Sequence, residues 1–325
     1  MPDSFEVGVV IPVYNGEKYI ADAVRSALRQ TVPPKEVIVV DDGSTDSTRE
    51  VLSTFGQQIA VIRQRNKGCA AARNAGIGKT RTEWIGFLDA DDMWKPNKLE
   101  RMSQAIPGQH EVGLLFSAVE HWWEHARRRQ IRRRDRDSQC RRLYQELAGT
   151  NAVLGGGSGA VVRRSCLLDA GLFDETLRSA EDWDMWIRIA RSWRAIYVDD
   201  VLTTYREHAS GLSKNAGRML KANLRVFAKH EPQFVADGFS GRSLCVAASK
   251  VYTRSAVAYL SSGEVTKARA LFWKAVHLDP LNTKASVPLL KMILGMKREL
   301  KITQRLGEFK RALRFSAHGS SKEWR

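Results

Sequence analysis

The chain has 325 residues, of which 43% are hydrophobic and 27% charged, a balance that suits a globular protein with a substantial core. Its formal net charge of +16 favours a polyanionic partner: nucleic acid, an anionic membrane surface or a phosphorylated substrate. The four cysteines are scattered without a CxxC pair, so we expect reduced thiols and neither a disulfide framework nor a zinc site.

The first residues, MPDSFEVGVV, lack the basic and apolar regions of a signal peptide. No stretch of the sequence reaches the roughly 18 consecutive apolar residues that cross a bilayer. We therefore expect a cytoplasmic protein.

Strand and helix patterns alternate in the first hundred residues. Strands buried on both faces are predicted at residues 6–13, 35–42, 59–64 and 84–90. Helices are predicted between them, one capped by Asn15 and one opened by the capping box Ser47-x-x-Glu50. This alternation predicts an α/β fold with a mostly parallel sheet and helices on both faces.

The pattern changes after this region. Residues 112–123 predict another strand, and the run at 127–142 holds nine Arg against two Asp, which is too much charge for a core element. A helix at 181–193 and one or two strands at 195–208 are predicted next. From about Lys214 the pattern is helical to the end.

Polar residues follow three of the predicted strands: Tyr14 with Asn15, Asp41 with Asp42, and the acids Asp89, Asp91 and Asp92. Ligands of open α/β sheets bind outside the carboxyl ends of the strands, so these clusters should meet along one edge of the sheet. Asp42 is placed to accept hydrogen bonds from a base or a ribose. A turn followed by a helix cap is the other interpretation of this stretch.

The acids at the end of the fourth strand would repel one another if they were buried together. Mg²⁺ or Mn²⁺ between Asp89, Asp91 and a diphosphate would offset this repulsion, because these ions keep waters and accept phosphate oxygens as ligands. An Asp-rich turn without a metal is the simpler interpretation. Asp92 is predicted to cap the helix near Pro96.

Five stretches together resemble a known family. In order they read VVIPVYNGEKYI, VIVVDDGSTDST, NKGCAAARNAGI, WIGFLDADDMW and AEDWDMWIRIA. Their order and spacing are similar to those of the family 2 glycosyltransferases, over roughly residues 6–213. The resemblance implies a GT-A fold and an inverting transferase that uses a nucleotide-sugar donor, commonly linked to UDP, and a divalent cation.

The resemblance also implies roles for individual residues. The nucleoside pocket and further donor contacts would be formed by Pro12, Tyr14, Glu17, Asp42, Lys67, Gly68 and Arg73. Asp89 would hold the ribose or a metal-bound water, and Asp91 would ligate the metal at the diphosphate. Arg206 and His208 stand in a segment similar to the family's RxHxxxxS motif and would contact the diphosphate. A solvated charge for Arg73 and a structural role for His208 are the alternatives.

An inverting transfer needs a base that removes the proton of the acceptor hydroxyl as it attacks. The resemblance selects Asp182 as this base, with Glu181 as the second candidate. The alternative is purely structural, because Ser179-x-x-Asp182 also reads as a capping box at a helix start.

The C-terminal region resembles one tetratricopeptide repeat at residues 256–282; a helical hairpin packed on the preceding domain is the alternative. Residues 291–325 hold ten Lys or Arg against three Glu and predict a basic amphipathic helix. Such a helix lies on anionic lipid or packs its apolar face inward. We expect a catalytic domain at 1–213, with a nucleotide-binding half at about 1–110 and an acceptor half at about 111–213, and an all-α extension at 214–325.

The resemblance, together with the basic composition, implies a cytoplasmic glycosyltransferase that works on a cell-surface glycan and that could lie peripherally on the membrane. Its expected substrates are a nucleotide-sugar donor and a glycan or lipid-linked acceptor. A sugar nucleotidyltransferase is the alternative among enzymes, but the expected glycine- and basic-rich N-terminal loop is missing. A basic nucleic-acid-binding protein is the alternative from another class. Only the charge supports it, because no recognition module is found and specific nucleic-acid binding is not expected.

Overall fold

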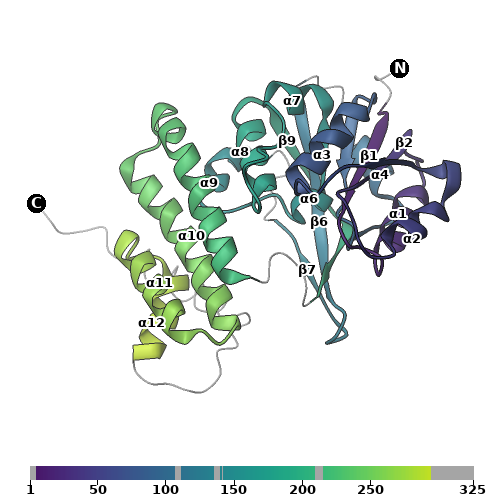
Figure 1. Ribbon diagram of the computed structural model, residues 1–325. Helices are drawn as coiled ribbons and strands as arrows, with labels where there is room; N and C mark the ends of the chain where they lie inside the picture. Colours follow the sequence, from purple (N-terminus) through teal and green to yellow (C-terminus); the bar gives the residue numbers. More distant parts are fainter. Residues whose placement is uncertain (1–4, 107–110, 135–139, 141, 209–214, 294–325) are drawn as a thin grey trace, which may run out of the picture.

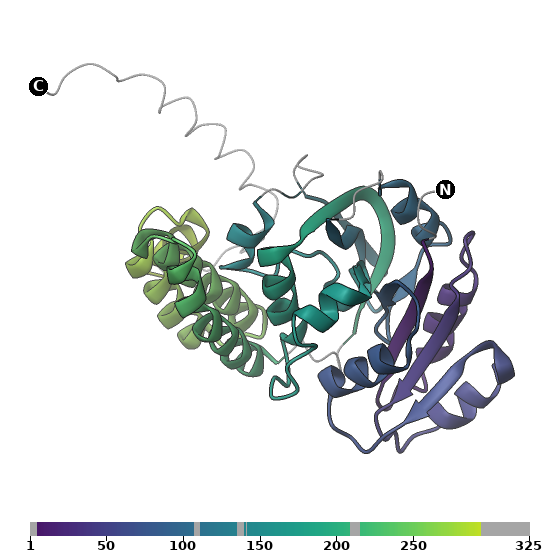
Figure 2. The same cartoon turned by 90° about the horizontal axis from the view of Figure 1, so that it is seen from above.

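The computed structural model describes residues 5–106, 111–134, 140, 142–208 and 215–293 (Figure 1). In these residues a mixed sheet of nine strands is flanked by helices, and four further helices form a separate layer beside it (Figure 2). The predicted α/β fold with a helical C-terminal region is thereby confirmed.

The sheet has the strand order β3-β2-β1-β4-β8-β6-β9-β5, and β7 pairs with β6 outside this path. Its strands are β1 Val7–Val13, β2 Glu36–Asp41, β3 Ala60–Arg63, β4 Trp84–Phe87, β5 Met93–Trp94, β6 Val112–Trp123, β7 Arg128–Arg132, β8 Ala160–Arg163 and β9 Arg194–Glu207. The first four strands pair in parallel, as does β6 with β9. Strand β8 runs antiparallel to both β4 and β6 and joins the two parallel parts.

The helices that flank the sheet are α1 Ile20–Leu28, α2 Thr48–Ser53, α3 Cys69–Lys79, α4 Lys98–Gln104, α5 Leu143–Leu147, α6 Gly156–Gly159, α7 Arg164–Asp169 and α8 Glu181–Ser192, with a short 3-10 turn, η1, at Gly56–Gln58. Strand β1 is buried throughout and divides its side chains between two cores. Val9 and Ile11 belong to one, and Val10 belongs to the other. The β-branched run therefore forms a strand because both of its faces are covered.

Helix α3 approaches β1 closely. A Cβ added to Gly76 would lie 2.3 Å from a methyl group of Val10, so only glycine fits there without a shift of the core. The small residues of this helix thus bring its N-terminus, and with it Arg73, close to the carboxyl edge of the sheet.

All three caps that the sequence predicts in this first part of the chain are wrong. Asn15 has a φ of +51° in a turn, and its side chain accepts a hydrogen bond from Thr45 N instead of capping α1. Ser47 precedes α2 but makes no capping bond, because Asp46 accepts from Thr48 N at 3.0 Å. Asp92 is buried and accepts hydrogen bonds from Ser158 Oγ and Arg206 N, whereas Asn97 stands at the cap position of α4.

The basic run forms part of the sheet at its margin. Strand β7 pairs with the end of β6, and its side chains are mostly exposed. The β6–β7 pair projects from the body of the sheet (Figure 1). The charge therefore excluded this segment from the core but not from a strand, since an edge strand tolerates charged side chains.

The C-terminal layer consists of α9 Ala216–Ala236, α10 Gly241–Ser261, α11 Val265–Leu278 and α12 Thr283–Ile293. Side chains from α9 and α10, among them Phe227, Phe234 and Val251, belong to the same core as the sheet. Residues from the end of α10 and from α11 and α12 form a smaller core of their own. The predicted repeat at 256–282 spans the α10–α11 hairpin; its assignment as a tetratricopeptide repeat stays a prediction.

Within the described ranges, no helix is both long enough and apolar enough to span a membrane. The predicted amphipathic tail after Ile293 lies outside the described residues.

Candidate active site

The turns that follow β1 and β2 are bonded to each other. Gly16 N donates to Thr48 Oγ1 at 2.8 Å, and Ser47 N donates to Glu17 Oε2 at 2.8 Å. Glu17 therefore holds the second turn in place. Pro12 is buried in β1, whereas Tyr14 stands exposed at the end of the strand. A ring at this position is free to stack on a ligand at the edge of the sheet.

Asp42 is buried at the end of β2 and organises the loop before α3. Its carboxylate accepts hydrogen bonds from Gln64 Nε2 at 2.7 Å, Lys67 N at 2.8 Å and Gly68 N at 2.7 Å. Three donors from the protein thus occupy most of the accepting capacity of the carboxylate. The predicted contact of Asp42 with a base or ribose stays a prediction, and its direct effect is to shape the loop.

The loop itself presents the Lys67 side chain to solvent. Gly68 has a φ of +95°, which favours glycine, and Arg178 lies so close that an added Cβ would fall 2.7 Å from its Nη1. Arg178 donates to the Lys67 carbonyl at 2.7 Å. The loop after β3 is therefore fixed from both sides.

Arg73 joins two parts of the chain that are distant in sequence. Its guanidinium is buried and donates to Glu181 Oε1 and to Asp89 Oδ1, each at 2.7 Å. It also lies over the ring of Phe173. The predicted contact of Arg73 with the donor is not tested, but its terminal nitrogens already bridge two of the predicted site carboxylates.

Asp182 lies beside this cluster in the first turn of α8. Its Oδ2 accepts from Asn151 Nδ2 at 2.9 Å, and its Oδ1 accepts from Trp183 N at 2.7 Å. The predicted capping box is wrong, because Ser179 donates to the Arg178 carbonyl and makes no cap bond to α8. Burial, and next the negative charge of Glu181, raise the pKa of Asp182 to about 6.

The resemblance implies that Asp182 is the base of a sugar transfer, and with this raised pKa that role predicts a pH dependence of the transfer rate. A base must be ionised, so the rate should rise about tenfold per pH unit below about pH 6 and level off above it. An unperturbed carboxyl would instead be fully ionised at pH 5. We expect this rise below about pH 6, the acidic limb of the profile, in kcat/KM measured from about pH 5 to 8. The affinity for the nucleotide is measured in parallel. A rate that stays constant down to about pH 5 would contradict the assignment of the base.

Asp91 faces His208, which directly follows β9. Asp91 Oδ2 and His208 Nε2 are 2.8 Å apart, and 37% of the Asp91 side chain is exposed. One carboxylate and one imidazole at this spacing can share a single ion, and they leave further positions for water and diphosphate oxygens. No group of three or more His, Cys, Asp or Glu in the described ranges is arranged as a metal site. The pair thus fits a cation that the substrate helps to hold.

Arg206 is buried below this pair. It donates to the Asp91 carbonyl at 3.1 Å and to Asp22 Oδ2 at 3.1 Å, and its guanidinium lies between the rings of Tyr19 and Trp122. These contacts hold the Asp91 turn against β9. The predicted contact of Arg206 with a diphosphate stays a prediction.

Sequence reasoning did not find Ser158 and Lys98, which hold Asp89 and Asp92 in place. Ser158 Oγ donates to Asp92 Oδ2 at 2.5 Å and accepts from Asp89 N at 3.0 Å. Lys98 is fully buried, and its Nζ donates to the carbonyls of Ser158 and Gly159 and to Thr203 Oγ1. The glycine-rich stretch around Ser158 indicated close packing. Lys98 gave no such signal, because a lysine in a helical pattern is usually a surface charge.

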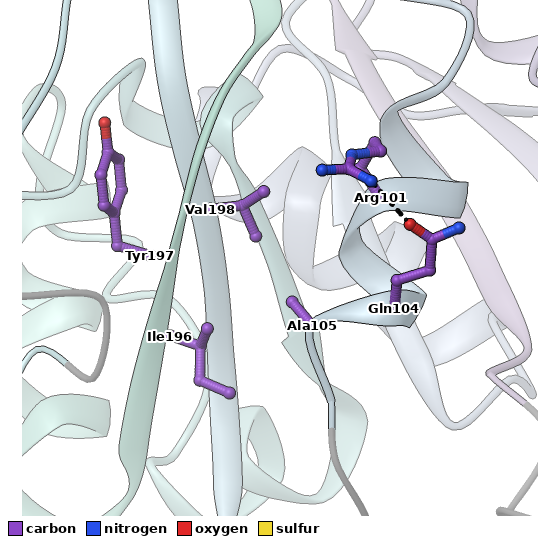
Figure 3. A pocket seen from close by; sticks show the side chains of 6 residues that line it. All are labelled: Arg101, Gln104, Ala105, Ile196, Tyr197 and Val198. Atoms are coloured by element: carbon purple, nitrogen blue, oxygen red, sulfur yellow. Dashed lines mark hydrogen bonds between the residues drawn. The ribbon is translucent and has the colours of Figure 1, made fainter.

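A hollow of about 340 Å³ lies elsewhere, between α4 and β9 (Figure 3). Its lining residues are Arg101, Gln104, Ala105, Ile196, Tyr197 and Val198. None of the predicted donor, metal or base residues is among them. The carboxylate cluster and its neighbours, not this hollow, therefore form the candidate active site.

The fold and the acidic site at the carboxyl edge of its sheet define a nucleotide-sugar transferase of the GT-A type. The model of the family named Glycosyl transferase family 2 matches residues 8–169. The chain belongs to this family.

Several relatives support this membership. An uncharacterized glycosyltransferase of Rickettsia prowazekii is 29% identical over 216 residues, which are 66% of this chain and 68% of that protein. A glycosyltransferase assigned to teichuronic acid biosynthesis in Bacillus subtilis is 42% identical over 99 residues, which are 29% of this chain and 39% of that protein.

Solved structures share the fold. Residues 1–349 of S. aureus TarS superpose with a TM-score of 0.54 and 19% identity, covering 89% of this chain and 92% of that one. TarS has been solved with UDP and with UDP-GlcNAc. A mannosyltransferase of Pyrobaculum calidifontis, solved with GDP-Man and Mn²⁺, reaches a TM-score of 0.57 at 20% identity and covers 90% of this chain and 81% of that one.

Proposed function

We propose that this protein is an inverting glycosyltransferase that moves a sugar from a UDP-linked donor to a hydroxyl of a glycan or lipid-linked acceptor. The observation that carries the proposal is the arrangement of Asp182, with its raised pKa, beside the Arg73 cluster that also holds Asp89. TarS has been solved with UDP and with UDP-GlcNAc, and the Bacillus subtilis relative is named for teichuronic acid biosynthesis, which supports a role in polysaccharide biosynthesis. Family membership favours this function over a nucleotidyltransferase or a nucleic-acid-binding protein.

The donor side of the mechanism follows from the turns at the sheet edge. Pro12, Tyr14, Glu17 and Asp42 and the loop at Lys67 and Gly68 would form the nucleoside pocket. Asp91 and His208, with Asp89 nearby, would hold Mg²⁺ or Mn²⁺. When bound, the ion supplies positive charge to the leaving diphosphate, so no general acid is needed.

The acceptor side depends on Asp182. Its carboxylate takes the proton of the acceptor hydroxyl while the hydroxyl oxygen attacks the anomeric carbon. Asn151 orients one carboxylate oxygen through the 2.9 Å hydrogen bond and leaves its second lone-pair site for the acceptor. Arg73 binds Glu181 and Asp89 and so limits the repulsion around the ionised base.

The metal role of Asp91 gives the first test of the proposal. Asp91→Ala should weaken UDP binding in Mn²⁺ by at least about tenfold and should change UDP binding in EDTA much less, because only the metal-bridged contact is lost. Calorimetric titration of both proteins with UDP, with and without metal, measures the difference. Asp200→Ala, at an exposed acid of β9, is the matched control and should behave as wild type. Equal UDP affinities in all titrations of both proteins would refute a bridging role.

We also propose that the protein works peripherally on the cytoplasmic face of the membrane. The support is the basic composition of residues 291–325, which lie beyond the described part of the chain except for their first three residues. Each basic residue near an anionic surface contributes about 1 kcal/mol, and inserted apolar side chains add an attraction that salt does not screen.

The protein should therefore sediment with vesicles that contain anionic lipid and much less with neutral vesicles. Deletion of residues 297–325 should remove the part of the binding that persists at high salt. If the full chain stays in the supernatant with anionic vesicles at low salt, the peripheral location is wrong.

A further inference from the structure

The short glycine-rich turn α6 contacts several groups of the candidate active site. A Cβ added to Gly156 would lie 2.8 Å from Asp182 Oδ2, and one added to Gly157 would lie 2.6 Å from Arg73 Nη2. Ser158, which follows, bonds the acids at the end of β4. Consecutive residues of one turn therefore contact the proposed base, the bridging arginine and the acidic cluster.

Buried hydrogen bonds hold this turn in place. The Ser158 carbonyl accepts from Trp94 Nε1 at 2.9 Å and from Lys98 Nζ at 3.0 Å, and Lys98 also donates to the Gly159 carbonyl at 3.1 Å. A Cβ on Gly159 would lie 1.9 Å from the Leu154 carbonyl oxygen, so the turn is closely packed on its own backbone. Movement of the turn would leave the fully buried Lys98 without its acceptors, which is costly. A side chain at position 156 would therefore displace Asp182 more readily than the turn.

The backbone conformation of Gly156 does not by itself explain the glycine. Its φ of +55° favours glycine in general. In this chain, however, Ala180 and Leu172 adopt φ values of +60° and +64°, so a residue with a side chain is tolerated at such a φ where space allows. Beside Gly156 that space is taken by the Asp182 carboxylate.

The oxygen that Gly156 faces is the one that an acceptor can use. Asp182 Oδ1 accepts from Trp183 N within α8, whereas Oδ2 accepts from Asn151 Nδ2 and keeps a second lone-pair site. Gly156 and Asp182 are both half-buried, so their contact lies near the surface. An O–H···O hydrogen bond spans about 2.7 Å, so a methyl group only 2.8 Å from Oδ2 would compete with the acceptor or push the carboxylate away.

We propose that Gly156 is a positioning residue of the transfer reaction, whose missing side chain keeps Asp182 Oδ2 in place and open to the acceptor hydroxyl. The inference rests on the proposed function, since it takes Asp182 as the base. It gives the glycine-rich turn a part in catalysis that packing alone does not require.

Gly156→Ala in the full chain tests the proposal, with Gly171→Ala as the matched control. Gly171 has a φ of +82°, and a Cβ there would meet nothing within 4 Å, so the control carries the backbone strain without the contact. The assay follows release of UDP from UDP-GlcNAc, UDP-glucose and UDP-galactose in Mn²⁺, with water as the acceptor. Gly156→Ala should lower kcat by at least about tenfold and keep the affinity for UDP within about threefold. Gly171→Ala should match wild type in both.

The pH profile separates a contact with the base from a loss of packing. A methyl group beside Oδ2 excludes water, which disfavours the ionised carboxylate, so the midpoint of the acidic limb should rise above about pH 6 in Gly156→Ala alone. Both substitutions leave the charged groups that act on Asp182 unchanged; these are Glu181, Arg73, Asp89 and Arg254. An unchanged kcat, or a lower kcat with an unmoved midpoint, would overturn the proposal.

A double variant decides the question if Gly156→Ala does not fold. Asp182→Ala removes the carboxylate that the new methyl group meets, so the protein with both substitutions should fold, as judged by its Tm. If Asp182→Ala folds alone but the double variant does not, Gly156 serves only the backbone and the proposal is wrong. Release of UDP by Asp182→Asn at the wild-type rate, or no release by wild type from any of the three donors, would instead overturn the proposed function.

Discussion

Asp182→Asn is expected to lower the rate of sugar transfer by about 10²- to 10⁴-fold, the usual contribution of a general base, while UDP affinity stays within a few-fold of wild type. The asparagine keeps the shape of the side chain and its hydrogen bond from Trp183 N, but it cannot accept a proton. Because the base acts on the acceptor, the donor site should be unaffected. Transfer kinetics with saturating donor, together with a UDP titration, measure the two effects separately.

Stability must be followed in the same experiment. Loss of a charged group in the first turn of α8 costs about 1 kcal/mol. The raised pKa of Asp182 acts in the opposite direction, since a carboxyl whose pKa is raised on folding destabilises the protein above that pKa when it ionises. We therefore expect only a small change in Tm at pH 7. A folded Asp182→Asn protein that transfers at nearly the wild-type rate would refute the assignment, and Glu181→Gln would then be the variant to examine.

The strands and helices that position the site were predictable because their signals are local. Uninterrupted apolar runs mark β1, β2 and β4, and helical spacing marks α8. The polar residues at the strand ends were predictable from the rule that ligands bind at the carboxyl edge of such sheets. The roles of individual residues came from the resemblance to a family and stay predictions.

What could not be predicted depends on contacts between distant segments. Nothing near Lys98 in the sequence indicates that the carbonyls of α6 will surround its ammonium group. The cap at Asn15 failed because its side-chain oxygen accepts a hydrogen bond from Thr45 N in the neighbouring turn. At α2, Asp46 accepts from Thr48 N, and Ser47 makes no capping bond.

Arg73→Met is the variant that should change both stability and the pH profile. Removal of the guanidinium leaves Asp89 and Glu181 without the cation that each of them bonds. Loss of one partner from a buried ion pair costs about 3–5 kcal/mol, and we expect the lower end because 30% of the Asp89 side chain is exposed. Urea unfolding at pH 7 measures this loss, which water entering beside Asp89 would reduce.

The pH profile of the same variant tests whether Arg73 also serves the base. The positive charge of Arg73 lowers the pKa of Asp182, against the effects of burial and Glu181. Its removal should therefore move the midpoint of the acidic limb in kcat/KM above about pH 6. Arg163→Met removes a guanidinium that pairs with Glu83 beside Trp84, away from the carboxylate cluster, and should lower stability without moving the midpoint. If both variants leave the limb where wild type has it, Arg73 acts only on folding. An upward shift that occurs only in Arg73→Met would show that Arg73, which pairs with Asp89 and Glu181, also lowers the pKa of Asp182.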